Sequence, residues 1–340
     1  MPKISALLSV YNGERYIEET IESVLNQTFS DFEFIIINDG STDSTKEIID
    51  RYKDNRIRAF HLEKNVGVGE ALRYGVSKVE GEYVVKIDGD DISNLSRFQK
   101  QKDFLDNNPS VALVKSLFEY FPHNKEVEQS SGYKYCKNVI EQHKNKVITP
   151  EDIKEKLYWF CCIPHTTIMI RSNILKKENY RPFRVCEDYD LFYRMNKAGY
   201  KMDTVAEVLV KTRVTGSSTS VTENKNNQFE EVAYEIKKEE IEKLISQKKP
   251  IYIWGAGSFG KKVLTVLNKR NIKVNGFVDS NYENLDKEYN NIPILPPKFL
   301  IEHKHLNPKI FVASQPGMFE IVEQLEECGY KHLSDYLVFH

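Results

Sequence analysis

Three aspartates fall within four residues, Asp88-Gly89-Asp90-Asp91, directly after the apolar segment 83–87. Carboxylates crowded at the end of a strand repel one another, so a cation or a hydrogen-bonding ligand is needed to hold them together. Hard divalent ions such as Mg2+ and Mn2+ take oxygen ligands and typically share them with substrate phosphates. The run therefore predicts a metal-bridged diphosphate. The alternative is a solvated acidic turn.

The elements that position this run alternate between strand and helix patterns. Such βαβ alternation predicts a parallel sheet with helices on both faces, and ligands bind beyond the carboxyl ends of its strands. Asp39 and Asp88 each follow a predicted strand, so we expect both to face one crevice. The predicted strands are 4–10, 32–37, 57–62 and 83–87.

The composition is that of a globular protein, with 40% hydrophobic and 29% charged residues. The net charge of −2 gives no reason to expect a nucleic-acid partner. The five cysteines lack zinc spacing and are odd in number, which favours reduced thiols in the cytoplasm. The chain starts directly in a strand, without a signal peptide or an apolar stretch of about 20 residues. We expect a cytoplasmic protein with at most peripheral membrane contact.

Two further features divide the chain. Residues 121–149 are polar and are expected to form a long loop over the site. A lysine-rich stretch at 247–250 is the best domain boundary, and a new β-α-β pattern opens at Ile251. The predicted parts are a first domain over 1–220, a linker helix over 221–248 and a second domain over 249–340.

Five motifs occur in order along the first domain. They are Leu7-Leu8-Ser9-Val10-Tyr11-Asn12, Ser23-Val24-Leu25-Asn26-Gln27-Thr28, Ile37-Asn38-Asp39-Gly40-Ser41-Thr42-Asp43, the Asp88–Asp91 run and Glu187-Asp188-Tyr189-Asp190-Leu191. Together they resemble family-two glycosyltransferases, the inverting enzymes of the GT-A fold, and the resemblance covers roughly residues 1 to 220. It implies a mixed, mostly parallel sheet and a nucleoside-diphosphate sugar donor, in this family usually a UDP-sugar. The implied acceptor is a glycan or lipid-linked hydroxyl in surface polysaccharide synthesis at the inner face of the membrane.

The resemblance assigns the nucleotide pocket by position. Ser9, Tyr11 and Asp39 match the residues around the base, and Asp88 matches a ribose-side position. A carboxylate at a strand end can accept the imide N–H of uracil, which cytosine lacks. The alternative for Asp39 is an Asp-Gly-Ser turn or a helix cap.

The same resemblance assigns the metal, Mn2+ or Mg2+. Asp90 matches the residue that holds the metal through the diphosphate, and Asp91 supports it. The metal would act as a Lewis acid that stabilises the departing nucleoside diphosphate.

Asp188 matches the family's catalytic base, which deprotonates the acceptor hydroxyl as it attacks the anomeric carbon. Alternatively, its carboxylate only suits a helix N-terminus.

One motif departs from the family, where an Arg-x-His element often follows the last strand. Here Arg213-Val214-Thr215 stands in its place, so Arg213 can pair with phosphate but a histidine ligand is missing. His165 is interpreted as a satisfied buried histidine.

The second domain carries a glycine fingerprint, Gly255, Gly257 and Gly260, followed by Asp279 at the end of the next strand. This pattern matches dinucleotide binding, although about 90 residues supply only one mononucleotide-binding half. The region resembles the small Rossmann-like domains appended to bacterial sugar-modifying enzymes. Three interpretations remain: a second nucleotide site, a domain used for packing, or a module through which the chain forms a homo-oligomer.

Two other functions compete with a glycosyltransferase. An NAD-linked oxidoreductase or epimerase would use the glycine fingerprint, but it leaves the acidic run unexplained and lacks a Tyr-x-x-x-Lys partner after the fingerprint. A non-catalytic subunit that binds nucleotide sugars would have no use for Asp188.

Overall fold

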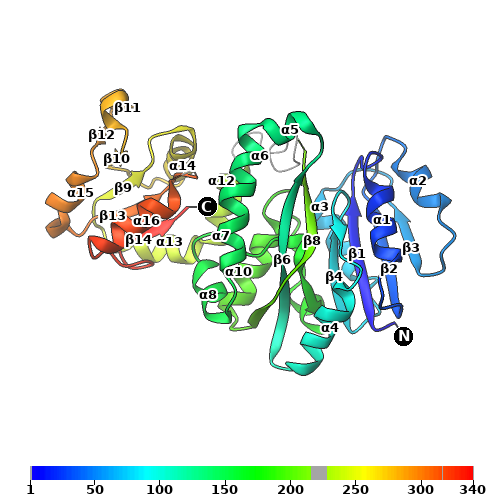
Figure 1. The fold of residues 1–340 in the computed structure, drawn as a ribbon. Helices are drawn as coiled ribbons and strands as arrows, with labels where there is room; N and C mark the ends of the chain where they lie inside the picture. The colour runs from blue at the N-terminus through cyan, green and yellow to red at the C-terminus, as the bar shows by residue number, and fades with distance from the viewer. Residues whose placement is uncertain (1, 216–227, 316, 340) are drawn as a thin grey trace. The chain divides into compact units, whose positions relative to one another are not determined.

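The structure, a computed structural model, describes residues 2–215, 228–315 and 317–339. The chain forms two compact units, Met1–Glu223 and Asn224–His340 (Figure 1). The predicted domain limits at 220 and 221 lie outside the described residues. Within the described ranges, no helix combines the length and the apolar run that crossing a bilayer requires.

Eight strands build the sheet of the first unit: β1 (Ile4–Val10), β2 (Phe32–Asn38), β3 (Ile57–His61), β4 (Tyr83–Asp88), β5 (Ile92–Ser93), β6 (Val111–Pro122), β7 (Met169–Arg171) and β8 (Lys201–Val214). Their order is β3-β2-β1-β4-β7-β6-β8-β5. The first four strands are parallel, which confirms the predicted βαβ alternation and places their carboxyl ends at one edge. β7 runs antiparallel to β4 and β6, so the sheet is mixed.

Helices cover both faces of this sheet, as predicted. On one face, α1, α2 and α4 share a core with side chains of β1, β2 and β4. On the other, α3 packs so closely that a Cβ atom at Gly75 would lie 2.5 Å from the Leu7 side chain of β1. The helices are α1 (Ile17–Leu25), α2 (Thr45–Arg51), α3 (Val68–Val76), α4 (Arg97–Asn107), α8 (Pro150–Lys156), α9 (Ser172–Glu178) and α10 (Glu187–Lys197).

The prediction of a long loop over 121–149 was wrong. β6 continues to Pro122, and short helices follow: α5 (Lys125–Gln129), α6 (Ser131–Tyr135), the π-helix η1 (Cys136–Ile140) and α7 (Glu141–Lys146). The polar side chains that suggested a loop bind the strand instead. The Glu141 carboxylate accepts the backbone N–H of Tyr120 at 2.6 Å, and the Asn145 amide donates to the carbonyl of Phe118 at 2.8 Å.

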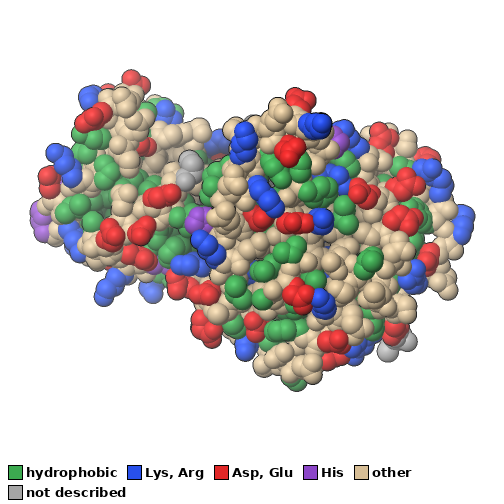
Figure 2. Space-filling model, viewed as in Figure 1, with side chains coloured by type: hydrophobic (Ala, Val, Ile, Leu, Met, Phe, Trp, Pro, Cys, Tyr) green, Lys and Arg blue, Asp and Glu red, His purple; other side chains and the backbone are tan. Residues whose placement is uncertain are grey.

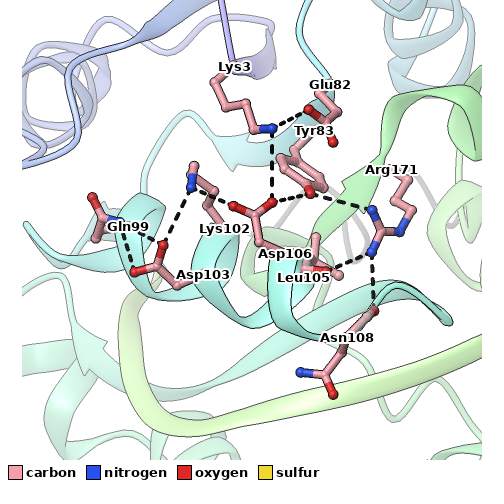
Figure 3. Close-up of polar contacts among 10 residues, drawn as sticks. All are labelled: Lys3, Glu82, Tyr83, Gln99, Lys102, Asp103, Leu105, Asp106, Asn108 and Arg171. Atoms are coloured by element: carbon pink, nitrogen blue, oxygen red, sulfur yellow. Dashed lines mark hydrogen bonds and ion pairs between the residues drawn. The ribbon is translucent and has the colours of Figure 1, made fainter.

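A polar network lies beside the amino end of β4, at the opposite end of this strand from the acidic run (Figure 3). The Tyr83 hydroxyl donates to Asp106 at 2.5 Å, and Lys3 pairs with Glu82 and Asp106. Arg171 of β7 donates to the carbonyl of Leu105 at 2.8 Å. These bonds fasten α4 to β4 and β7.

The second unit is built on a six-stranded sheet in the order β11-β12-β10-β9-β13-β14. Its strands are β9 (Ile251–Trp254), β10 (Gly276–Val278), β11 (Glu288–Tyr289), β12 (Ile292–Leu295), β13 (Lys309–Val312) and β14 (Tyr336–Val338). All pairs are parallel except β11 with β12. The helices and helical turns are α12 (Gln228–Ile236), α13 (Lys238–Ile245), α14 (Ser258–Asn268), η4 (Tyr282–Asn284), α15 (Lys298–Glu302), η5 (Lys304–Leu306) and α16 (Met318–Glu327).

The segment predicted as one linker helix contains two helices, α12 and α13. Ala233, Ile241 and Leu244 from these helices lie in the core of the second unit with Ile253 of β9.

On the surface, basic and acidic side chains are interspersed over the face shown in Figure 2, in line with the small net charge.

The three fingerprint glycines differ in what surrounds them. Gly255 has φ +119°, and a Cβ atom there would lie 2.3 Å from the carbonyl oxygen of Ala313. At Gly260 it would lie 1.8 Å from the carbonyl oxygen of Gly255. At Gly257 it would meet nothing within 4 Å. Packing therefore demands glycine at the first and third positions and leaves the second open.

We predict that Gly260→Ala destabilises the second unit by roughly 1 to 3 kcal/mol, because the new methyl group overlaps backbone atoms that cannot rotate away. Gly257→Ala is the matched control and should leave the free energy of unfolding unchanged. Trp254 lies in this unit and Trp159 in the other. Denaturant unfolding followed by fluorescence in a Trp159→Phe background isolates the relevant signal. Equal stability of the two alanine variants would contradict the packing account.

Candidate active site

The parallel register gathers the predicted nucleotide-pocket residues at one edge of the sheet. Ser9 of β1 lies opposite Asp88 of β4, and the backbone N–H of Asp39 donates to the carbonyl of Val10 at 2.8 Å. Tyr11 follows and is 46% exposed. Carboxyl ends of parallel strands are where ligands bind in such sheets. The structure thus brings Ser9, Tyr11, Asp39 and Asp88 together.

Asp39 is buried and fastens a neighbouring loop. Its two carboxylate oxygens accept the backbone N–H groups of Val66, at 2.8 Å, and of Gly67, at 2.9 Å. Each carboxylate oxygen has two lone pairs, so acceptor capacity remains for a ligand. The sequence suggested a turn or cap as the alternative role, but the partners come from the loop that leads into α3.

This loop and the first turn of α3 also contact the segment that precedes α10. The backbone N–H of Gly69 donates to the carbonyl of Phe183 at 3.2 Å, and Arg184 donates to the Asn65 side chain at 3.0 Å. A Cβ atom at Gly69 would lie 2.4 Å from the Phe183 carbonyl oxygen, so only glycine permits this approach. Asp39 is thereby linked to the chain that leads to Asp188.

Lys86 is a buried cation that sequence reasoning missed. Its side chain is 2% exposed, and its ammonium group donates to the Ile87 carbonyl at 2.8 Å and pairs with Asp88. Burial raises the pKa of Asp88, but the charge and the hydrogen bond of Lys86, together with the charges of His165 and Arg97, hold the pKa below its usual value. A lysine inside an otherwise apolar strand, two residues before Asp88 and so on the same strand face, was the available signal.

Arg97 is a second buried cation beneath the acidic run. It is fully buried and donates to the carbonyl of Lys86 at 3.1 Å and that of Ile168 at 3.3 Å. Burial lowers the pKa of Arg97 to about 9, against the opposing charges of Asp91 and Asp88. Two buried cations of the protein, Lys86 and Arg97, therefore offset part of the negative charge of the acidic run.

The two remaining aspartates of the run resist ionisation. Burial, followed by the charge of Asp88, raises the pKa of Asp90 to about 6. Burial, followed by the charges of Asp90 and Asp88, raises the pKa of Asp91 well above its usual value. The Asp91 carboxylate accepts the backbone N–H of Arg213 at 2.9 Å. Added positive charge at this point would favour ionisation of both groups.

A divalent cation fits this donor set. Among the described residues, no three His, Cys, Asp or Glu side chains converge into a complete metal cage. Mg2+ does not need one, because it is usually bound by one or two carboxylates together with substrate phosphates and water. Asp90 is partly exposed, so its carboxylate could hold the ion, with the buried Asp91 behind it.

Arg213, expected to pair with phosphate, makes contacts within the protein. Its guanidinium group pairs with Glu19 and donates to the carbonyl of Asp90 at 3.0 Å. It lies over the rings of Tyr16, at 4.6 Å, and Phe121, at 4.4 Å. In this arrangement Arg213 positions the backbone of the acidic run.

Asp188 lies in the first turn of α10. The residue before that helix, Cys186, has a left-handed backbone with φ 58°. The Asp188 carboxylate accepts the backbone N–H of Tyr189 at 2.7 Å, and the Cys161 thiol lies 3.8 Å from its other oxygen. Burial, followed by the charge of Glu187, raises the pKa of Asp188. A raised pKa suits a carboxylate that must accept a proton.

The charges of Asp188 and Asp88 both act on His165. Burial lowers the pKa of His165 to about 4, while the charges of Asp188 and Asp88 oppose that shift. His165 is therefore within electrostatic reach of both carboxylates. Its Nε2 atom lies 2.8 Å from the Tyr180 hydroxyl oxygen, so the interpretation as a satisfied buried histidine is confirmed. The influence of these two charges on His165 had no signal in the sequence.

Both units of the chain are similar to known proteins. The family model described as glycosyl transferase family 2 matches residues 5–178, and one described as C2185-like, N-terminal matches 246–333. An uncharacterised glycosyltransferase of Methanocaldococcus jannaschii is 32% identical over 218 residues, 63% of this chain and 71% of the relative. The O-antigen biosynthesis glycosyltransferase WbnJ of Escherichia coli is 30% identical over 225 residues, 64% and 81% of the two chains.

The fold has a solved counterpart. The crystal structure of S. aureus TarS 1-349 in complex with UDP-GlcNAc matches with a TM-score of 0.55 and 19% identity. The match covers 80% of this chain and 73% of that one. The mixed sheet of the first unit is that of a GT-A-like glycosyltransferase domain.

We predict that Asp39→Asn loosens the loop at Val66 and Gly67, because an amide nitrogen cannot accept the N–H that the lost oxygen held. An unsatisfied buried donor costs about 1–3 kcal/mol. Hydrogen exchange at these two amides should accelerate, and exchange at Gly69 should follow. The control Asp103→Asn changes an exposed aspartate bound to side chains. Unchanged exchange at 66 and 67 would refute the role of Asp39 in the loop.

Proposed function

This chain belongs to glycosyl transferase family 2, and on that premise we propose that it is a metal-dependent, inverting hexosyltransferase that uses a UDP-sugar. The acceptor is a hydroxyl group of a glycan or lipid-linked glycan in surface polysaccharide synthesis, at the cytoplasmic face of the membrane. The observation that carries the proposal is the gathering of the expected nucleotide-pocket residues and the acidic run at the carboxyl ends of the parallel strands β1, β2 and β4.

In the proposed reaction, the acceptor oxygen attacks the anomeric carbon from the face opposite the diphosphate. The acceptor proton passes to the Asp188 carboxylate, and the bond between the anomeric carbon and the diphosphate oxygen breaks. The electron pair of that bond leaves with the diphosphate, so the configuration inverts. The raised pKa of Asp188 supports this assignment, because it brings the base closer to neutral pH.

Asp90 would hold Mn2+ or Mg2+ with Asp91 in support, and the bound ion would stabilise charge on the leaving diphosphate. The protein's own cations act beneath the run. Lys86 keeps Asp88 ionised for the ribose side, and Arg213 holds the backbone of Asp90. Because no histidine follows Arg213 in the Arg-x-His position, a bound metal would be held by carboxylates and the substrate.

The uracil pocket would be formed by Ser9, Tyr11 and Asp39. Two facts support uracil: Asp39 retains acceptor capacity for an imide N–H, and the structural relative TarS binds UDP-GlcNAc. An exposed aromatic ring at Tyr11 offers a surface on which a base can stack.

For the second unit we propose a Rossmann-like fold with a nucleotide site at Gly257. The open space at this glycine supports the site, since neither packing nor backbone conformation requires glycine there. Gly255 and Gly260 serve the close packing of β9 and α14. Asp279 accepts the backbone N–H groups of Ala256 and Asn281, each at 2.8 Å, and so shapes the loop.

Asp188→Asn should abolish transfer while donor binding persists, because the amide keeps the shape of the carboxylate but cannot take a proton. Loss of a general base typically costs about 100- to 10,000-fold in rate. A panel of nucleotide sugars with an acceptor extract, scored by release of free nucleotide, measures the effect.

Asp203→Asn is the matched control, since Asp203 also accepts the N–H of the following residue, at 2.8 Å. Full activity of the Asp188 variant on the best donor would refute the assignment of the base.

Metal removal provides the next prediction. EDTA should stop transfer and added Mn2+ should restore it, because the leaving diphosphate loses its counter-charge. Asp90→Ala should weaken the response to Mn2+ and lower the rate by roughly 100-fold or more, a loss of several kcal/mol of charge stabilisation. Nucleotide release that ignores both EDTA and this substitution would show that the reaction does not depend on a metal.

A further inference from the structure

The second unit carries an open cleft of about 570 Å3 beside the start of β9. The end of α13, the segment that leads into β9 and the turn after α14 form its walls. Among the described residues that line the cleft, four are basic and none is acidic or aromatic. The chain as a whole has a net charge of −2, so this gathering of positive charge is local. The basic residues are Lys248, Lys249, Arg270 and Lys273.

Within the part of the chain that the structure describes, three of these four cations have no carboxylate partner. Arg270 is the exception, because its guanidinium group pairs with Glu231 at 2.8 Å and with Glu235 at 3.2 Å. The three lysines are exposed to solvent. The cleft therefore presents the positive charge of three lysines that the protein itself does not neutralise.

The backbone holds these lysines around the cleft. Lys248 and Asn271 both have left-handed backbones, with φ 52° and φ 57°. The Lys248 N–H donates to the carbonyl of Ile245 at 3.0 Å, which closes the turn after α13. Asn275 binds Ile251 twice, because its N–H donates to the carbonyl at 2.7 Å and its side-chain oxygen accepts the N–H at 2.9 Å. Hydrogen bonds thus fix the segments that carry the lysines, and the like charges stay close together.

We propose that this cleft binds the phosphate headgroup of an anionic phospholipid and thereby holds the protein at a membrane surface. Lysine side chains near an anionic leaflet each favour binding by electrostatic attraction. The exposed side chains of Asn271 and Asn275 carry amide N–H groups that can donate to phosphate oxygens. Attachment through a headgroup needs no helix that crosses the bilayer.

The choice of a lipid rests on the proposed function, in which the acceptor lies at the membrane. The lining of the cleft disfavours nucleic acid, because no aromatic ring among its described residues offers a base a surface for stacking. A phosphate carried by a lipid needs only the positive charge and the amide donors.

The first test measures sedimentation of the full chain with lipid vesicles. At low ionic strength, the protein should bind vesicles of phosphatidylcholine that contain phosphatidylglycerol and should stay in solution with vesicles of phosphatidylcholine alone. Binding should fall steeply as NaCl is added, because salt screens exposed charges over distances beyond about 10 Å at 0.1 M. Equal binding to both kinds of vesicle, or no binding to either, would overturn the proposal.

A charge-removal variant locates the binding surface. It combines Lys248→Gln, Lys249→Gln and Lys273→Gln, and its partition coefficient onto the anionic vesicles should fall roughly 100-fold, since each lysine near the surface contributes several-fold. The matched control removes the same charge from exposed lysines of the same unit that lie outside the cleft, Lys287, Lys298 and Lys331. An equal loss in both variants would show that net charge alone drives binding and would overturn the assignment to the cleft.

A soluble headgroup distinguishes a lipid from a free phosphate ligand. Glycerol 3-phosphate at micromolar concentrations should leave the protein on the vesicles, because a single soluble phosphate lacks the many headgroups of a surface. Displacement at these concentrations would assign the cleft to a soluble phosphate compound and overturn the proposal. Sedimentation is read without turnover, so a failure of vesicle binding and a failure of the Asp188→Asn prediction are separate results.

Discussion

The repulsion among the carboxylates of the acidic run is the constraint on which the first unit depends. The protein meets it with two cations that are withdrawn from solvent, Lys86 within β4 and Arg97 beneath it. Burial and the mutual repulsion of the carboxylates raise the pKa of Asp90 and Asp91, whereas Asp88 stays ionised beside Lys86. The run is thus charged at one end and receptive to a cation at the other.

The sequence predicted the strands and their shared edge, because apolar stretches of strand length followed by Asp39 and Asp88 leave few alternatives. It did not predict the helices between 125 and 146, because their side chains satisfy the edge of β6 rather than an apolar core. The partners of Arg213 and the place of His165 depend on residues more than a hundred positions apart or on separate elements, which no local pattern encodes.

Both units use an aspartate after a parallel strand to fix a loop through two backbone N–H groups. Asp39 binds Val66 and Gly67, and Asp279 binds Ala256 and Asn281. In each case a residue type expected to recognise a nucleotide first shapes the loop around the expected pocket. A carboxylate can serve both purposes, because each of its oxygens accepts more than one hydrogen bond.

The left-handed backbone of Cys186, next to the turn that carries Asp188, has a consequence for how this protein can change. A side chain in that conformation stores roughly 1 to 3 kcal/mol of strain. Replacement by glycine would relieve the strain, but it would also make the backbone at the start of α10 more flexible. A substitution at this position that raises the stability of the protein would therefore be expected to lower its activity.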